Sequence, residues 1–131
     1  MPSLEITANV APKNLDEFVK TASAKFAQLI GKPESEKKLG LPLKSASAPV
    51  PIQYCLVSFI KADQLSFAGS LDPAAIVKII SIGNITPTRN QETSKVLSEY
   101  LESELGIPSR RFYIFFTDIA GSNVGFGGST F

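Results

Sequence analysis

The sequence predicts an α+β fold in which two β-α-β units form a four-stranded mixed sheet under two helices. Its length of 131 residues is that of one ordinary domain. A strand–helix–strand pattern occurs twice along the chain, and both predicted helices end in a Gly-x-Pro sequence, at residues 31–33 and 106–108. We therefore expect a single domain over residues 1–131 that repeats one unit.

In the first unit, apolar and polar residues alternate with a period of two from Ser3 to Val10, which indicates a strand. From Leu15 to Ile30 the apolar residues recur at three- and four-residue spacing, which places them on one face of a helix. Asn14 is placed to cap this helix, and Glu17 completes a capping box three residues later. An apolar run within Tyr54–Lys61 predicts the second strand.

The second unit repeats this order with a β-branched strand at Ala74–Ile82, a helix at Arg89–Leu105 and a closing strand at Arg111–Thr117. Both strands are apolar at almost every residue, which is typical of strands buried on both faces. Because two helices cover only one face of a sheet, we expect the other face to pack against further subunits. The glycine-rich tail that begins at Gly121 predicts a terminal hairpin.

The two units differ in length because residues 34–52 are inserted into the first one. Pro42, Pro49 and Pro51 exclude a regular helix over most of this segment. Long connections of this kind are either tolerated surface insertions or functional lids. Both interpretations stay open for residues 34–52.

The chain contains no histidine and a single cysteine, Cys55. A Ser-His-Asp triad, a Cys-His dyad and a histidine-ligated metal are therefore excluded for this chain. Cys55 lies in an apolar run, and we interpret it as a buried structural thiol. Any acid–base group of an enzyme built from this sequence must be an unusual one.

The charge balance argues against general attraction to polyanions, because 13 basic and 12 acidic residues leave a net charge of +1. We therefore expect neither a nucleic-acid partner nor a membrane partner. No apolar run reaches the roughly 18 residues of a membrane helix, and the first residues lack the pattern of a secretory signal. A cytoplasmic protein is the expectation that follows.

Pro2 is a candidate for the unusual acid–base group. Small second residues permit removal of Met1, which would leave the secondary amine of Pro2 as the chain terminus. An α-amino group has a pKa of roughly 7.7–8.0, and desolvation or a neighbouring cation lowers that pKa further. Such an amine is a general base suited to neutral pH. If Met1 is retained instead, Pro2 has no free amine and cannot act as a base.

Seven short motifs occur in order and span nearly the whole chain apart from residues 34–52. They are Met1-Pro2-x-Leu4, Gly31-Lys32-Pro33, Asp63-Gln64-Leu65, Phe67-x-Gly69-Ser70 with Asp72-Pro73-x-Ala75, Ser81-Ile82-Gly83, Asn123-Val124-Gly125-Phe126 and Ser129-Thr130-Phe131. This ordered set resembles the macrophage migration inhibitory factor and D-dopachrome tautomerase family. The resemblance implies the same two β-α-β units and a homotrimer whose sheets enclose a channel, which would account for the strands that are apolar on both faces.

The resemblance also implies a cofactor-independent, metal-free keto–enol tautomerase that acts on small aromatic α-keto acids such as phenylpyruvate, or on dopachrome-like compounds. Pro2 falls on the catalytic base of the family, and Lys32 falls on the lysine that holds the substrate carboxylate. Tyr113 falls on a pocket tyrosine that relatives supply from the adjacent subunit. The remaining positions of the pocket wall and lining are Ile82, Phe115, Val124, Phe126 and Phe131.

The sequence departs from the family pattern at three places. Phe115 stands where animal relatives carry asparagine, so we expect a more apolar pocket and a lower activity. Phe126 replaces a tryptophan, which keeps an aromatic wall but removes an N–H donor. Residues 74–77 replace the Cys-x-x-Cys of some relatives, so a thiol oxidoreductase role is not supported. The insertion follows Lys32 directly and therefore starts at the expected mouth of the pocket.

Structural interpretations of the same residues stay open. Lys32 is favourably placed at a helix C-terminus whatever else it does. Ile82 and Val124 would also fit an apolar core, and the hydroxyl group of Tyr113 would also satisfy a buried partner.

A cytokine-like signalling protein with a vestigial pocket is the alternative function, because animal relatives are extracellular cytokines that bind protein receptors. Asp63 falls on a loop position implicated in that contact, and the matching basic position falls on residues 11–13, Ala-Pro-Lys. Under this alternative, the protein would also be released from the cell without a signal peptide.

Overall fold

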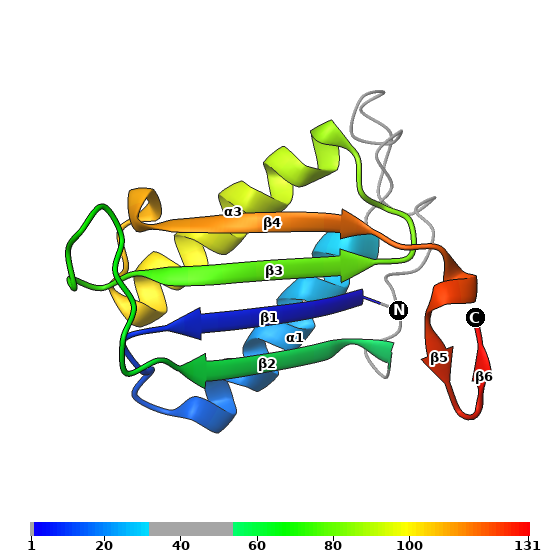
Figure 1. The fold of residues 1–131 in the computed structure, drawn as a ribbon, viewed down its shortest axis with the longest axis horizontal. Helices are drawn as coiled ribbons and strands as arrows, with labels where there is room; N and C mark the ends of the chain where they lie inside the picture. The colour runs from blue at the N-terminus through cyan, green and yellow to red at the C-terminus, as the bar shows by residue number, and fades with distance from the viewer. Residues whose placement is uncertain (1, 32–53) are drawn as a thin grey trace.

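The computed structural model describes residues 2–31 and 54–131 and shows a sheet with two helices packed on one face (Figure 1). Its four strands are β1 (Pro2–Ala8), β2 (Leu56–Lys61), β3 (Ala75–Ser81) and β4 (Phe112–Asp118), in the order β2-β1-β3-β4. The pairs β1–β2 and β3–β4 are parallel, whereas β1 and β3 pair antiparallel at the centre. The predicted mixed sheet of two β-α-β units is confirmed.

Helix α1 (Leu15–Gly31) starts where the sequence predicts. Its cap is also confirmed, because the Glu17 N–H donates to Asn14 Oδ1 at 3.1 Å. Lys32 and Pro33, which follow the helix, lie outside the described residues.

Helix α3 (Pro87–Leu105) begins two residues before the predicted Arg89. Pro87 suits the first turn because its missing N–H would have no helical partner there. Thr86 caps the helix by accepting a hydrogen bond from the Arg89 N–H at 3.2 Å. Gly106 ends it in the left-handed conformation, with φ of 67°.

The core lies between the sheet and the helices. Leu4 and Ile6 of β1 and Val77 and Ile79 of β3 are almost fully buried and pack in one cluster with Phe26 of α1 and Leu97 and Leu101 of α3. The opposite face of the sheet carries exposed apolar side chains: Leu56, Ile60, Ile76, Tyr113 and Phe115. In the single chain β3 and β4 are therefore buried on one face only, and the expected packing of the other face against further subunits stays a prediction. One face is covered by the helices and the other is open.

Two polar side chains hold the loop of residues 62–74, at the end of the sheet opposite Pro2. The Asn9 side chain donates to the carbonyls of Leu65, Leu71 and Asp72 at 3.1–3.3 Å and accepts from the Ala74 N–H at 2.9 Å. The Arg111 guanidinium donates to the carbonyls of Phe67, Ser70, Asp72 and Pro73 at 2.9–3.3 Å. Arg111 follows Ser109 and Arg110 in the short helix η3 (Ser109–Arg111).

The predicted terminal hairpin is confirmed. After the short helix η4 (Gly121–Asn123), strands β5 (Gly125–Phe126) and β6 (Ser129–Thr130) pair antiparallel. Gly121 packs against the backbone of Phe131, where an added Cβ would lie 3.2 Å from the carbonyl oxygen. The hairpin lies at the same end of the molecule as the N-terminus (Figure 1). Across the described ranges, neither α1 nor α3 has the length and apolar character needed to cross a membrane.

Candidate active site

Pro2 begins the central strand β1 and is almost completely buried. It pairs with Ser81 at the end of β3, and Ser81 pairs in turn with Asp118 at the end of β4. Because neighbouring strands lie about 4.8 Å apart, the backbones of Pro2 and Asp118 are about 10 Å apart. The three residues thus form a row across one end of the sheet.

Ile82 continues from this row into the turn between β3 and α3. It is half-buried, and the main-chain groups on both sides of it are tied to the end of β4. The Ile119 N–H donates to the Ser81 carbonyl at 2.9 Å, and the Gly83 N–H donates to Asp118 Oδ1 at 2.9 Å. The structure therefore places Ile82 directly beside the residue that pairs with Pro2.

Three aromatic rings gather at the same end of the sheet. Phe126 and Phe131 of the terminal hairpin stack with ring centroids 5.4 Å apart. The Tyr54 ring meets both edge-on, at 5.6 Å and 6.2 Å. Tyr54 precedes β2, whose Leu56 pairs with Ser3 next to Pro2, so the three rings lie at the same end of the sheet as Pro2. Val124, half-buried, joins them through its carbonyl, which accepts from the Phe131 N–H at 3.2 Å.

Tyr113 and Phe115 do not lie with Pro2 in the single chain. Tyr113 pairs with Ile76, five residues along β3 from Ser81, which is about 16 Å at a strand rise of 3.3 Å per residue. Both rings point to the open face, with 64% and 53% of their surfaces exposed. They form a second aromatic group with Phe67, whose ring lies 5.2 Å from that of Tyr113.

The remaining sequence predictions have separate outcomes. Lys32 and the insertion at residues 34–52 lie outside the described residues. Cys55 is half-buried rather than buried, and desolvation raises the pKa of its thiol. Arg110 is exposed, whereas its neighbour Arg111 donates to the main-chain carbonyls of the loop.

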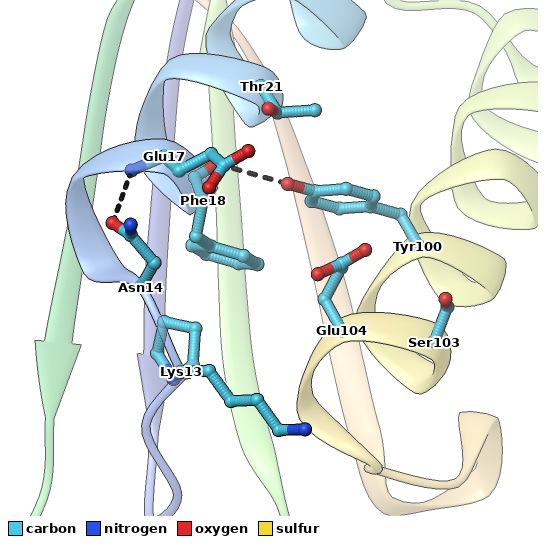
Figure 2. A pocket seen from close by; sticks show the side chains of 9 residues that line it. Lys13, Asn14, Glu17, Phe18, Thr21, Tyr100, Ser103 and Glu104 are labelled. Atoms are coloured by element: carbon cyan, nitrogen blue, oxygen red, sulfur yellow. Dashed lines mark hydrogen bonds between the residues drawn. The ribbon is translucent and has the colours of Figure 1, made fainter.

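A cavity of about 350 Å³ lies at the far end of the helices from Pro2, between the start of α1 and the last turns of α3 (Figure 2). Lys13, Glu17 and Glu104 carry its charged groups. The Tyr100 hydroxyl donates to the Phe18 carbonyl at 3.0 Å, and the two rings stack with centroids 5.3 Å apart. The residues predicted for the active site do not line this cavity.

Sequence reasoning missed three side chains that shape the two ends of the sheet. Asn9 and Arg111 hold the loop, and Asp118 holds the turn at Gly83. Their partners are 35 to 65 residues away along the chain, so no local periodicity points to them. The available signal was position: each is a polar residue at the boundary of an apolar strand.

An antiparallel pair of β-α-β units, with a buried proline opening one central strand, is the architecture expected for the tautomerase superfamily. A family model described as macrophage migration inhibitory factor matches residues 37–131. A macrophage migration inhibitory factor homologue from Trichinella spiralis is 33% identical over 132 aligned positions, covering all of both chains.

Solved structures agree with this assignment. The macrophage migration inhibitory factor homologue from Prochlorococcus marinus superposes with a TM-score of 0.79 at 30% identity, covering 98% of each chain. The Trichinella spiralis protein gives a TM-score of 0.71 at 34% identity, covering 98% of this chain and 99% of the other. The chain belongs to the macrophage migration inhibitory factor family.

Proposed function

We propose that the protein is a cofactor-independent keto–enol tautomerase for small aromatic α-keto acids, with Pro2 as the general base once Met1 has been removed. The observation that carries this proposal is the placement of Pro2: it is buried, paired with Ser81 and at the same end of the sheet as the aromatic group of Tyr54, Phe126 and Phe131 (Figure 1). An aromatic substrate suits such a wall, because rings favour stacked and edge-to-face contacts. Dopachrome-like compounds offer the same ring and carboxylate.

The chemistry follows from the burial of the Pro2 amine. Removal of Met1 converts the Pro2 nitrogen from an amide into a secondary amine with a lone pair. Burial disfavours the protonated form, so the amine is a base at neutral pH. It removes a proton from the carbon beside the carbonyl and returns a proton to the other end of the keto–enol system. Lys32 is proposed to hold the substrate carboxylate, and Ile82 and Val124 to line the pocket.

We further propose that the active protein is a homotrimer. The open sheet face supports this, because Leu56 is 67% exposed and Tyr113 is 64% exposed in the single chain. Rings and aliphatic side chains at that exposure are costly in water unless a partner covers them. Tyr113 pairs with β3 about 16 Å from Ser81, and both Tyr113 and Phe115 are exposed on the open face, whereas Pro2 of their own chain is buried. In the trimer they would complete the pocket of an adjacent subunit.

The first test is a spectrophotometric assay of phenylpyruvate and 4-hydroxyphenylpyruvate on protein whose intact mass shows that Met1 is absent. Pro2→Gly keeps a free terminal amine but loses the proline ring, and we expect its turnover to fall by about 100-fold or more. Protein that retains Met1 is the matched control and should be as inactive as the variant. The wild-type rate should fall at acid pH as the amine is protonated. A rate that stays level down to about pH 4 would exclude Pro2 as the base.

The shared pocket has its own test. Pro2→Gly and Tyr113→Ala would each be impaired alone, whereas trimers assembled from a mixture of the two contain some pockets with both residues intact. Refolding the two variants together should therefore restore part of the activity. Mixtures no more active than the separate variants would show that Pro2 and Tyr113 do not act across an interface.

A cytokine-like signalling function is the second candidate, and the surface around Asp63 favours it. The Ala62 N–H donates to the Ala8 carbonyl at 2.8 Å, and Asn9 donates to the Leu65 carbonyl. Exposed Asp63 therefore lies beside the segment that leads to exposed Lys13. A Pro2→Gly protein that keeps its full effect on cells would support signalling. An effect that is lost together with turnover would support catalysis.

A further inference from the structure

We propose that Asp118 is a positioning residue of this active site, acting through the main-chain N–H of Gly83. This inference rests on the proposed tautomerase function and deepens it. Asp118 is the last residue of β4, and its Oδ1 accepts the Gly83 N–H at 2.9 Å. Its backbone lies in the same row as Pro2 and Ser81.

The turn after β3, which Asp118 binds, has an unfavourable backbone conformation. Gly83 and Asn84 both have positive φ, 76° and 62°, a region that few residues other than glycine and asparagine adopt at low cost. Two hydrogen bonds from the end of β4 fix the main chain on either side of Ile82. The Ile119 N–H binds the Ser81 carbonyl, and the Asp118 carboxylate binds the Gly83 N–H.

Only one of these two bonds depends on a side chain. The Ile119–Ser81 bond continues the pairing of β3 with β4 and survives any substitution that keeps the backbone. The Asp118–Gly83 bond is lost when the carboxylate is removed, which frees the peptide between Ile82 and Gly83 to rotate. That peptide adjoins the residue paired with Pro2, so its rotation would move the pocket wall relative to the base. A displacement of about 1 Å near reacting atoms can reduce a rate about 100-fold.

The inference requires the acceptor oxygen of Asp118 and not its charge. Asp118→Asn keeps an oxygen at the same position, whereas Asp118→Ala removes it. We expect Asp118→Ala to lower kcat for phenylpyruvate by about 10- to 100-fold, with a smaller change in KM and an unchanged acid limb of the pH profile. Asp118→Asn should restore kcat to within about threefold of wild type. Asp72→Ala removes the same charge from the exposed loop at the other end and should leave kcat unchanged.

A second readout is independent of turnover. Amide exchange measured by NMR should show a protected Gly83 N–H in wild type, Asp118→Asn and Asp72→Ala, and faster exchange in Asp118→Ala. The inference is overturned if Asp118→Ala keeps wild-type kcat, or if Asp118→Asn is as impaired as Asp118→Ala. It is also overturned if Asp118→Ala loses only thermal stability. A wild-type protein with a protected Gly83 amide but no turnover would instead refute the proposed function, and the positioning role with it.

Discussion

The two ends of the sheet use polar side chains in different ways. At the loop end, Asn9 and Arg111 together make eight hydrogen bonds to the main chain of residues 65–74. At the Pro2 end, among the described residues, a side-chain hydrogen bond from the Gly83 N–H to Asp118 Oδ1 holds the turn beside Pro2. At the loop end, these polar side chains therefore bind main-chain groups of the same chain. The Pro2 end instead gathers rings and a buried proline, which are groups suited to hold and transform an apolar ligand.

This difference matters for the proposed trimer. Tyr113 lies next to the loop that Arg111 holds, because the Phe67 ring contacts Tyr113 and also lies 5.6 Å beneath the Arg111 guanidinium. A pocket completed by Tyr113 of an adjacent subunit would therefore combine the rigid end of one chain with the Pro2 end of the next. Rigidity at one end would position groups for chemistry at the other.

The largest effect is expected from breaking the loop end. Arg111→Ala removes four hydrogen bonds from a charged donor, and we expect it to lower the free energy of unfolding by about 3 kcal/mol. Arg111→Lys should recover little of this loss, because an ammonium group lacks the planar fork of donors. Exposed Arg110→Ala is the control, with an expected change within about 0.5 kcal/mol.

Urea unfolding at one fixed protein concentration measures these differences, since assembly makes stability depend on concentration. An Arg111→Ala protein as stable as Arg110→Ala would mean that the loop holds its shape without the guanidinium. Side-chain hydrogen bonds would then not be what stabilises the loop end relative to the Pro2 end.

At the Pro2 end, we expect a substitution to reduce activity more than stability. Phe126 is 59% exposed, so Phe126→Ala should lower the free energy of unfolding by less than about 1 kcal/mol. Its ring is part of the proposed pocket wall, so kcat/KM for phenylpyruvate should fall about tenfold, or roughly 1.4 kcal/mol of transition-state binding. Phe126→Leu keeps apolar bulk, so its kcat/KM should lie between those of wild type and Phe126→Ala. A variant that loses stability but keeps its activity would assign Phe126 to folding alone.

The elements of the fold followed from local patterns in the sequence. The alternation of apolar and polar residues predicted both ends of β1 to within two residues. Single residues predicted the N-cap of α1 at Asn14 and the end of α3 at Gly106. The parallel pairing within each half of the sheet followed from the repeat of one β-α-β unit. The open face was inferred only indirectly, because a doubly apolar strand such as β4 does not say which of its faces the helices leave uncovered.

The site was harder to predict because its contacts are long-range. The pairing of Pro2 with Ser81 follows from topology, but the contact of Tyr54 with Phe126 depends on how the tail folds back. Nothing local distinguishes Arg111, which holds the loop, from exposed Arg110 beside it. Pro2 was a candidate base from its position after Met1 in a chain without histidine, whereas the role expected of Tyr113 came from the family resemblance alone.

The smallest effect concerns Tyr100, which joins α3 to α1 near the loop end. Its hydroxyl donates to the Phe18 carbonyl at 3.0 Å, and Tyr100→Phe should lower the free energy of unfolding by about 1 kcal/mol at neutral pH. The pKa of the phenol is raised above its usual value of 10.0, first by burial and then by the charges of Glu104 and Glu17. The stability gained from Tyr100 is therefore linked to pH.

The sign of that linkage is fixed by the raised pKa. Below about pH 10 the folded and the unfolded chain both keep the phenolic proton, so the contribution of Tyr100 is fully present. Above that pH the unfolded chain ionises first, and the contribution is lost as pH rises through the folded pKa. The stability gap between wild type and Tyr100→Phe should therefore shrink above about pH 10, whereas effects of Tyr54 and Tyr113 cancel between the two proteins. Urea unfolding across this range measures the gap, and a gap that stays constant or widens would show that neither burial nor the two glutamates govern this phenol.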